Sequence, residues 1–102
     1  MAKRLEEENK IHDATLVYER LLKIDPENIQ FRLNVAELYK SMGSIDQAVE
    51  RFNDVVENRI RHKAFSETEE ILDRTKTLKA DHPRTLGNIL ELLKAEDRKR
   101  ML

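Results

Sequence analysis

The sequence has 102 residues, of which 39% are hydrophobic and 38% are charged, and its formal net charge at pH 7 is −1. A chain of this length forms one domain with a modest core. A net charge near zero provides no overall field that attracts nucleic acid or an anionic membrane. The absence of cysteine excludes disulfide scaffolds and cysteine-ligated metal sites. No apolar run is long enough to cross a bilayer and the N-terminus has no signal-peptide core, so we expect a cytoplasmic protein.

The few residues that stop or start helices divide the chain into helical segments. Asp25 and Pro26 are typical of an N-cap and a first helical residue, Gly43 of a left-handed C-terminal stop, and Pro83 of the start of a last helix. No segment alternates with period two for long enough to form a strand. The sequence therefore predicts an all-α protein with helices at 2–9, 12–24, 26–42, 45–62, 67–80 and 83–95.

Two of these helices are predicted to begin with a capping box, in which a hydroxyl side chain and a side chain three residues later bond each other's backbone N–H groups. The pairs are Ser44 with Gln47 and Ser66 with Glu69. At position 60, where a proline could end the fourth helix, the sequence has Ile60. We therefore expect that helix to continue without a sharp turn.

The apolar residues repeat at helical spacing and predict a buried stripe on each helix. Shifting the sequence by about 34 residues places small residues on small ones and aromatic residues on aromatic ones. The matched pairs are Ala2 with Ala36, Leu5 with Tyr39, Ile11 with Ile45, Ala14 with Ala48, Tyr18 with Phe52 and Leu21 with Val55. Closely crossing helices need a small side chain at the contact and a bulky one beside it, which explains this pattern physically.

The residues that repeat resemble the tetratricopeptide repeat family. The segment 28–53 carries Ala36 and Tyr39, then Gly43 at the turn, then Ala48 and Phe52. This resemblance covers roughly residues 1–60. It implies antiparallel helix pairs stacked as a right-handed α-solenoid of about six helices, with an inner, concave surface that binds a peptide or a partner helix.

The resemblance also suggests how residues 1–102 are organised as a single helical-repeat domain. We expect a half to full repeat at 1–28, a repeat at 29–62, a degenerate repeat at 63–82 and the first helix of a further repeat at 83–102. Residues 61–80 fit the 34-residue shift poorly, whereas the residues after Pro83 repeat the offsets of those after Pro26. Both ends begin or stop within a helical pattern, so we expect a piece of a longer array.

The sequence contains no arrangement that predicts catalysis, a metal site or a cofactor. His12, His62 and His82 lie far apart and outside any ligand motif. Neither Gly43 nor Gly87 belongs to a phosphate-binding loop, and no serine lies in a nucleophile elbow. The abundant carboxylates are expected on solvated helix faces, where acid–base catalysis lacks a desolvated cleft. We therefore expect neither an enzyme nor a cofactor.

The family resemblance implies a partner-binding surface on the first helix of each pair. Carried over to this sequence, the expected concave face comprises Lys3, Glu6, Glu7, Gln30, Leu33, Glu37, Lys40 and Ser41. Repeats of this family that clamp a C-terminal carboxylate carry asparagine where this sequence has Glu37, and a carboxylate there repels that ligand. A helical or extended protein segment fits this mixed-charge surface better.

The last helix predicts a second surface, for self-association, because Leu86, Ile89, Leu90 and Leu93 share one of its faces. A homodimer through this helix is therefore expected. The main functional hypothesis is a protein–protein interaction scaffold or adaptor. The alternative is a structural spacer or self-assembly segment of a larger protein. An RNA-binding repeat would need base-reading side chains once per repeat, and the sequence shows none, so we expect no nucleic-acid partner.

Overall fold

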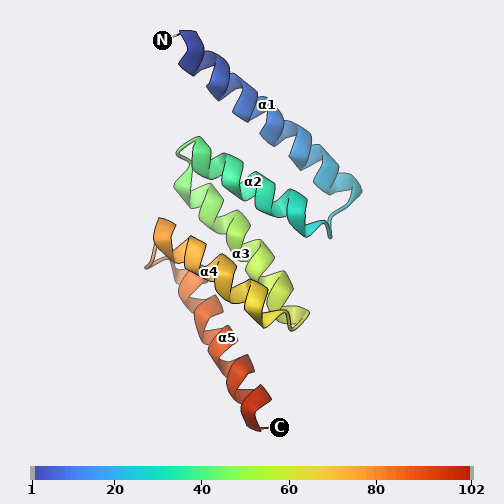
Figure 1. Cartoon of the computed structure of the whole chain (residues 1–102), viewed down its shortest axis with the longest axis vertical. Helices are drawn as coiled ribbons and strands as arrows, with labels where there is room; N and C mark the ends of the chain where they lie inside the picture. Colours follow the sequence, from blue (N-terminus) through green and yellow to red (C-terminus); the bar gives the residue numbers. More distant parts are fainter. Residues whose placement is uncertain (1, 102) are drawn as a thin grey trace. The chain divides into compact units, whose positions relative to one another are not determined.

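The computed structural model describes the backbone of residues 2–101 and the side chains of residues 9–97. Across the described backbone the chain forms helices and no strands, which confirms the all-α prediction (Figure 1). The helices are α1 (Ala2–Ile24), α2 (Ile29–Ser41), α3 (Ile45–Arg61), α4 (Phe65–Leu78) and α5 (Pro83–Met101). The chain divides into two compact parts, residues 1–51 and 52–102, and the boundary lies within α3.

The first helix, α1, is continuous, so the prediction of two helices at 2–9 and 12–24 is wrong. The expected break has neither glycine nor proline, and nothing there removes a backbone hydrogen bond of the helix. Thr15 lies buried just after it and donates its hydroxyl to the Ile11 carbonyl oxygen at 2.8 Å. The described chain therefore contains five helices rather than the six expected.

The second helix, α2, starts three residues after the predicted position. Its N-cap is Asn28, whose side-chain oxygen accepts the Phe31 backbone N–H at 3.0 Å. Asp25 instead donates its backbone N–H to the Leu21 carbonyl at the end of α1, and Pro26 lies in the turn. Asparagine and aspartate are about equally good N-cap residues. The helix uses Asn28, which stands at the end of the turn.

The turns after α2 and α3 have the same hydrogen-bond pattern. Gly43 has φ 77° and donates its N–H to the Lys40 carbonyl, and Lys63 has φ 59° and donates to the Ile60 carbonyl. In each case the next residue bonds the carbonyl five positions earlier. The left-handed stop predicted at Gly43 is confirmed. The prediction that α3 continues without a sharp turn is wrong, because Lys63 adopts the conformation that glycine supplies after α2.

The starts of α4 and α5 differ in how well the sequence predicted them. Helix α4 begins at Phe65 with Ala64 as its N-cap and no side-chain cap hydrogen bond, so the capping box predicted at Ser66 is wrong. Ser66 lies inside the first turn of α4. Pro83 is the first residue of α5, as predicted.

Three of the residues predicted at close helix contacts are among the most deeply buried. In the first part, α1 packs against α2, with the rings of Tyr18 and Phe31 5.8 Å apart, and Ala36 and Ala48 are fully buried. In the second part, α4 packs against α5, and Phe52 is only 1% exposed. Tyr18, its counterpart in the 34-residue repeat, is half-buried. The core is therefore built on the repeated small and aromatic positions, but unequally.

Exchanging the residue types at the two left-handed turn positions has opposite expected effects. No atom lies within 4 Å of a Cβ added at Gly43, so Gly43→Ala meets no clash, and only its positive φ opposes the side chain. We expect Gly43→Ala to lower the free energy of unfolding by about 1–2 kcal/mol. Lys63→Gly is expected to raise it by about 0.5–1 kcal/mol, because relief of strain exceeds the added freedom of the unfolded chain. Urea unfolding measures both, and a loss of stability in Lys63→Gly would contradict the assignment.

Enlarging the small buried residues should overpack the first part of the chain. Ala36→Leu and Ala48→Leu are each expected to lower the free energy of unfolding by about 1–3 kcal/mol, because neither alanine has solvent-exposed surface. Ala80→Leu, at an exposed turn position, is the matched control. Thermal and urea unfolding provide the comparison, and core variants as stable as the control would show that the repeat register is misassigned.

Candidate functional site

The helices of the first part are joined by one arginine on α3. Arg51 bonds the carboxylate of Glu19 on α1, with distances of 2.9 and 3.0 Å to its two oxygens. The same guanidinium lies 5.9 Å from the centre of the Tyr39 ring on α2. Arg51 therefore contacts both other helices of this part.

In the second part, a buried hydrogen bond occupies the equivalent position. The Asn53 side-chain amide on α3 donates to the Thr85 hydroxyl on α5 at 3.0 Å, and neither side chain is exposed. Adding 34 to Glu19 and Arg51 gives Asn53 and Thr85, so the repeat seen in the sequence is also a repeat of an interhelical contact. A shift of 34 residues thus makes α5 the counterpart of α3. The spacing of the apolar residues after Pro83 instead matched it to α2, the helix that follows Pro26. The repeat boundaries expected from the sequence stay a prediction.

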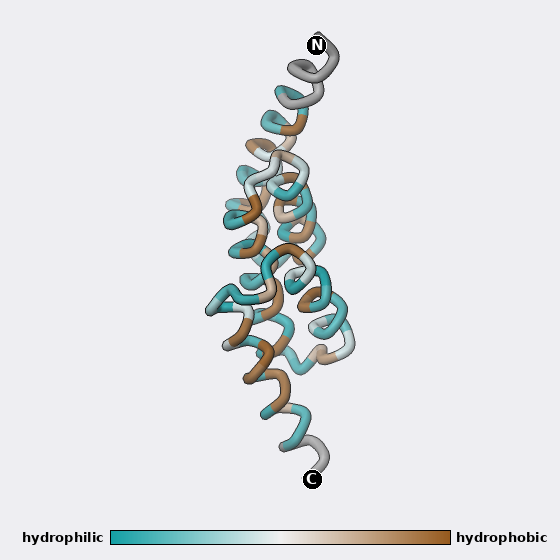
Figure 2. Tube along the Cα trace, turned by 90° about the vertical axis from the view of Figure 1, so that its left-hand side faces the viewer, coloured by the Kyte–Doolittle hydropathy of each residue, from teal (hydrophilic) through white to brown (hydrophobic). Residues whose placement is uncertain are grey.

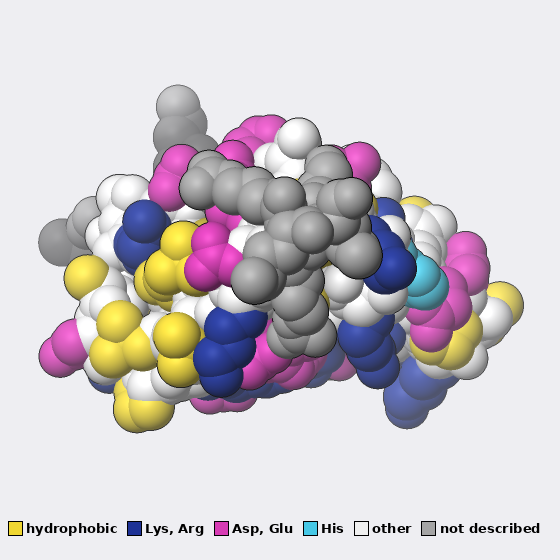
Figure 3. Space-filling model, turned by 90° about the horizontal axis from the view of Figure 1, so that it is seen from below, with side chains coloured by type: hydrophobic (Ala, Val, Ile, Leu, Met, Phe, Trp, Pro, Cys, Tyr) yellow, Lys and Arg dark blue, Asp and Glu magenta, His cyan; other side chains and the backbone are white. Residues whose placement is uncertain are grey.

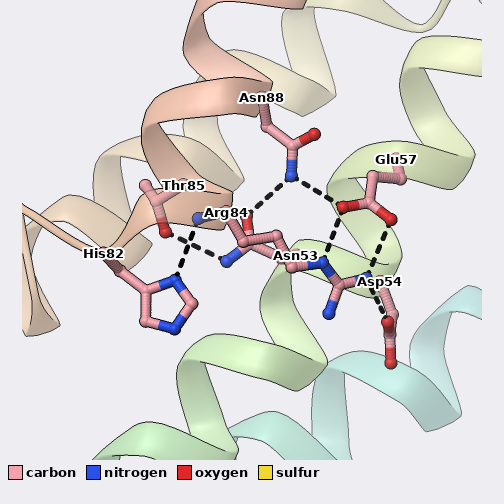
Figure 4. A network of polar contacts seen from close by, with 7 residues as sticks. All are labelled: Asn53, Asp54, Glu57, His82, Arg84, Thr85 and Asn88. Atoms are coloured by element: carbon pink, nitrogen blue, oxygen red, sulfur yellow. Dashed lines mark hydrogen bonds and ion pairs between the residues drawn. The ribbon is translucent and has the colours of Figure 1, made fainter.

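A second amide extends this buried contact. The Asn88 side-chain amide on α5 donates to the Asn53 oxygen at 2.8 Å and to the Glu57 carboxylate at 3.0 Å (Figure 4). Asn88 is 7% exposed. Buried amides cost stability unless they are hydrogen-bonded, so the burial of both asparagines requires α3 and α5 to keep this relative rotation.

Charged groups close the exposed side of this network. Arg84 on α5 donates from Nε to Glu57 at 2.7 Å and from Nη2 to the other oxygen of the same carboxylate at 2.8 Å, and it also pairs with Asp54 (Figure 4). Such a two-point contact has a defined geometry. Hydrogen bonding from Arg84 outweighs partial burial and holds the pKa of Glu57 below its usual value.

This network determines which side of α5 faces outward. Since Thr85, Asn88 and Leu92 are buried, residues on the opposite side of α5 are exposed. Leu86, Leu90 and Leu93, one helical turn apart, are 51%, 52% and 54% exposed, and we call them the leucine face. Figure 2 shows hydrophobic residues alternating with hydrophilic ones along this helix. Ile89, predicted to belong with them, is half-buried.

Two carboxylates meet where α4 packs against α5. Glu69 on α4 shares a hydrogen bond with Glu96 on α5, and this bond together with their mutual repulsion raises the pKa of Glu69. The proximity of Glu96 therefore favours the protonated form of Glu69. Both belong to the contact between these helices, and Glu69 is solvent-exposed.

The structure places the described part of the predicted concave face on one side of α2. Helical spacing brings Gln30, Leu33, Glu37, Lys40 and Ser41 together, and we call them the α2 face. Gln30, Lys40 and Ser41 are exposed, and Leu33 and Glu37 are half-buried. Lys3, Glu6 and Glu7 lie outside the residues whose side chains are described.

Short-range hydrogen bonds order the α2 face. Gln30 donates its side-chain amide to Asn34 at 3.0 Å, and the Ser41 hydroxyl donates to the Glu37 carbonyl at 3.0 Å. The face combines an acid, a base and a leucine without a single dominant charge.

The histidines lie apart from one another in sequence and serve no common site. His12 and His62 are exposed, and His82 accepts the Arg84 backbone N–H through Nδ1 at 3.3 Å at the start of α5. Among the described residues no group of histidine, aspartate and glutamate side chains is arranged to hold a metal ion. Lysine and arginine side chains lie among acidic ones on the face seen in Figure 3. None of the described helices combines the length and hydropathy needed to cross a membrane.

Sequence reasoning missed the polar network between α3 and α5. A signal was present: Asn53 and Glu57 are four residues apart, as are Arg84 and Asn88, so each pair shares a helix face. Asn53 also adjoins Phe52 within an apolar stripe, where a polar residue needs a buried partner. The partner of Asn53 on α5 could not be identified from the sequence. Residues 61–80 fit the 34-residue shift poorly, so the correspondence between α3 and α5 was not recognised.

Comparison with known proteins provides one match. Residues 5–59 match the sequence profile of the family described as tetratricopeptide repeat. The match spans α1, α2 and nearly all of α3. Neither the curated proteins nor the solved structures include a significant match to the chain.

The contact between Glu57 and Arg84 makes stability depend on pH. Since the pKa of Glu57 is lowered on folding, its contribution is complete above about pH 4.5 and is lost as pH falls through the lowered value. Glu57→Gln is expected to reduce the free energy of unfolding by about 1 kcal/mol at pH 7, a small value because both side chains are partly exposed. The difference from the unsubstituted chain should shrink towards pH 3. Urea unfolding between pH 3 and 7 measures it, and a difference independent of pH would contradict the ion pair.

Proposed function

Because the chain belongs to the tetratricopeptide repeat family, we propose that it is a protein–protein interaction module that binds a peptide or helical segment on the α2 face. The match to this family carries the proposal, since repeats of the family generally mediate contacts between proteins and do not catalyse reactions. The partner is therefore a protein, and the module acts as a scaffold or adaptor.

The chemistry of the α2 face supports a peptide as the ligand. Glu37 and Lys40 lie about one turn apart beside Leu33, so a bound segment can place opposite charges and one apolar side chain against them. Glu37 disfavours a ligand that presents a carboxylate at this point. A segment with a basic residue next to an apolar one fits this surface.

An observation also favours the alternative, a spacer or self-assembly segment. The leucine face of α5 exposes three large apolar side chains by about half each. Single exposed leucines are ordinary on protein surfaces, but a row of them on one helix indicates an interaction surface. Self-association through this helix and a cytoplasmic location both stay predictions.

Peptide selection followed by charge reversal tests the proposed function. Peptides would be selected from a random display library against the chain, and Kd would be measured by fluorescence anisotropy. We expect Glu37→Lys and Lys40→Glu each to weaken binding by roughly tenfold, because each places like charges opposite each other. Asp81→Lys, in the exposed turn before α5, is the matched control and should leave Kd unchanged. Failure to select any peptide, or equal Kd values for the α2 variants and the control, would contradict the proposal.

A further inference from the structure

A second row of apolar side chains lies exposed on α1. Leu16, Val17 and Ile24 are 49%, 55% and 81% exposed, and we call them the α1 face. Asp13 and Lys10, on the same side of the helix and one and two turns before Val17, are exposed too. This apolar surface therefore continues into a charged one towards the N-terminus of α1.

The leucine face of α5 also continues into two charged side chains at the same spacing, with the signs of the charges exchanged. Leu90 is followed by Lys94 four residues later and by Asp97 three residues after that. Both charged side chains are exposed. Lys94 also contacts Glu91 on its own helix at 3.9 Å, an exposed pair that contributes little and leaves the ammonium group able to turn.

We propose that the leucine face of α5 docks on the α1 face of a second copy of the chain, with the two helices antiparallel. When Leu90 lies opposite Val17, equal steps along the helices place Lys94 opposite Asp13 and Asp97 opposite Lys10. Both pairs have opposite charge, and in the same register Leu86 lies opposite Leu21 and Leu93 opposite Ala14. This charge match identifies the occupant of the leucine face as α1 of another copy.

Pairings of the same surfaces centred on the same residues lack this match. In an antiparallel α5–α5 contact centred on Leu90, Lys94 lies opposite Leu86 and Asp97 opposite Pro83, so neither meets an opposite charge. Arg84 lies opposite Glu96 there, but Arg84 is already bonded to Glu57 and Asp54 within its own chain. In an α1–α1 contact centred on Val17, Asp13 lies opposite Leu21. The contact between α5 and α1 is therefore head-to-tail, and it uses a different surface on each copy.

This proposal does not depend on peptide binding by the α2 face, which none of the variants below alters. Analytical ultracentrifugation over a concentration series measures the association. The unsubstituted chain is expected to associate as its concentration rises. Leu90→Glu and Val17→Glu should each be monomeric at concentrations where the unsubstituted chain associates into dimers and longer head-to-tail oligomers, and circular dichroism confirms that each is folded.

Mixing the two variants separates a head-to-tail contact from the others. An equimolar mixture of Leu90→Glu and Val17→Glu retains one intact α1 face and one intact leucine face, so it should form a one-to-one heterodimer. An α5–α5 dimer would instead form in Val17→Glu alone, and the mixture would contain that homodimer rather than the heterodimer, which would overturn the proposal. A chain that stays monomeric at every concentration would also overturn it.

Charge exchange tests the register itself. Asp13→Lys and Lys94→Asp each place like charges at the contact, and we expect each to weaken association by roughly tenfold. The double variant restores opposite charges and should associate like the unsubstituted chain. Single variants that associate normally, or a double variant that is weakened additively, would overturn the pairing of Asp13 with Lys94.

Discussion

The hydrogen bonding of two buried amides, Asn53 and Asn88, is the constraint on which the second part of the chain depends. An unpaired buried amide costs roughly 1–3 kcal/mol, a large share of the stability of a small domain. Both amides find partners only when α3 and α5 keep one relative rotation, in which Thr85 and Glu57 supply oxygens. Apolar packing alone tolerates several rotations of a helix, whereas this set of donors and acceptors specifies one.

The same constraint links the core to the surface. Because the polar side of α5 is buried, Leu86, Leu90 and Leu93 on its other side are exposed. In the first part Arg51 plays the corresponding role with charged rather than neutral groups. Positions 34 residues apart therefore make equivalent interhelical contacts. The contact uses charged side chains in the first part and neutral ones in the second. Two kinds of surface are exposed or half-buried, a mixed-charge face on α2 and apolar faces on α1 and α5, and these are the surfaces that we propose bind partners.

The sequence predicted the fold class well because helical spacing of apolar residues and small–aromatic pairs report directly on packing. Ala36, Ala48 and Phe52 were placed correctly in the core. Helix ends were harder to predict because several residues compete as caps. The N-cap of α2 is Asn28 rather than Asp25. Lys63 adopts a left-handed backbone conformation that is most common for glycine. The polar network was missed because its members lie about 30 residues apart and only the folded chain brings them together.

The most direct test of this account is the solvent exposure of individual leucine methyl groups on α5, measured by NMR with a paramagnetic cosolute at low protein concentration. We expect strong relaxation enhancement for Leu86, Leu90 and Leu93, which are about half exposed, and protection of Leu92, which is 6% exposed. Equal enhancement for Leu92 and its neighbours, or protection of Leu90 in the monomer, would show that the polar network does not set the orientation of α5.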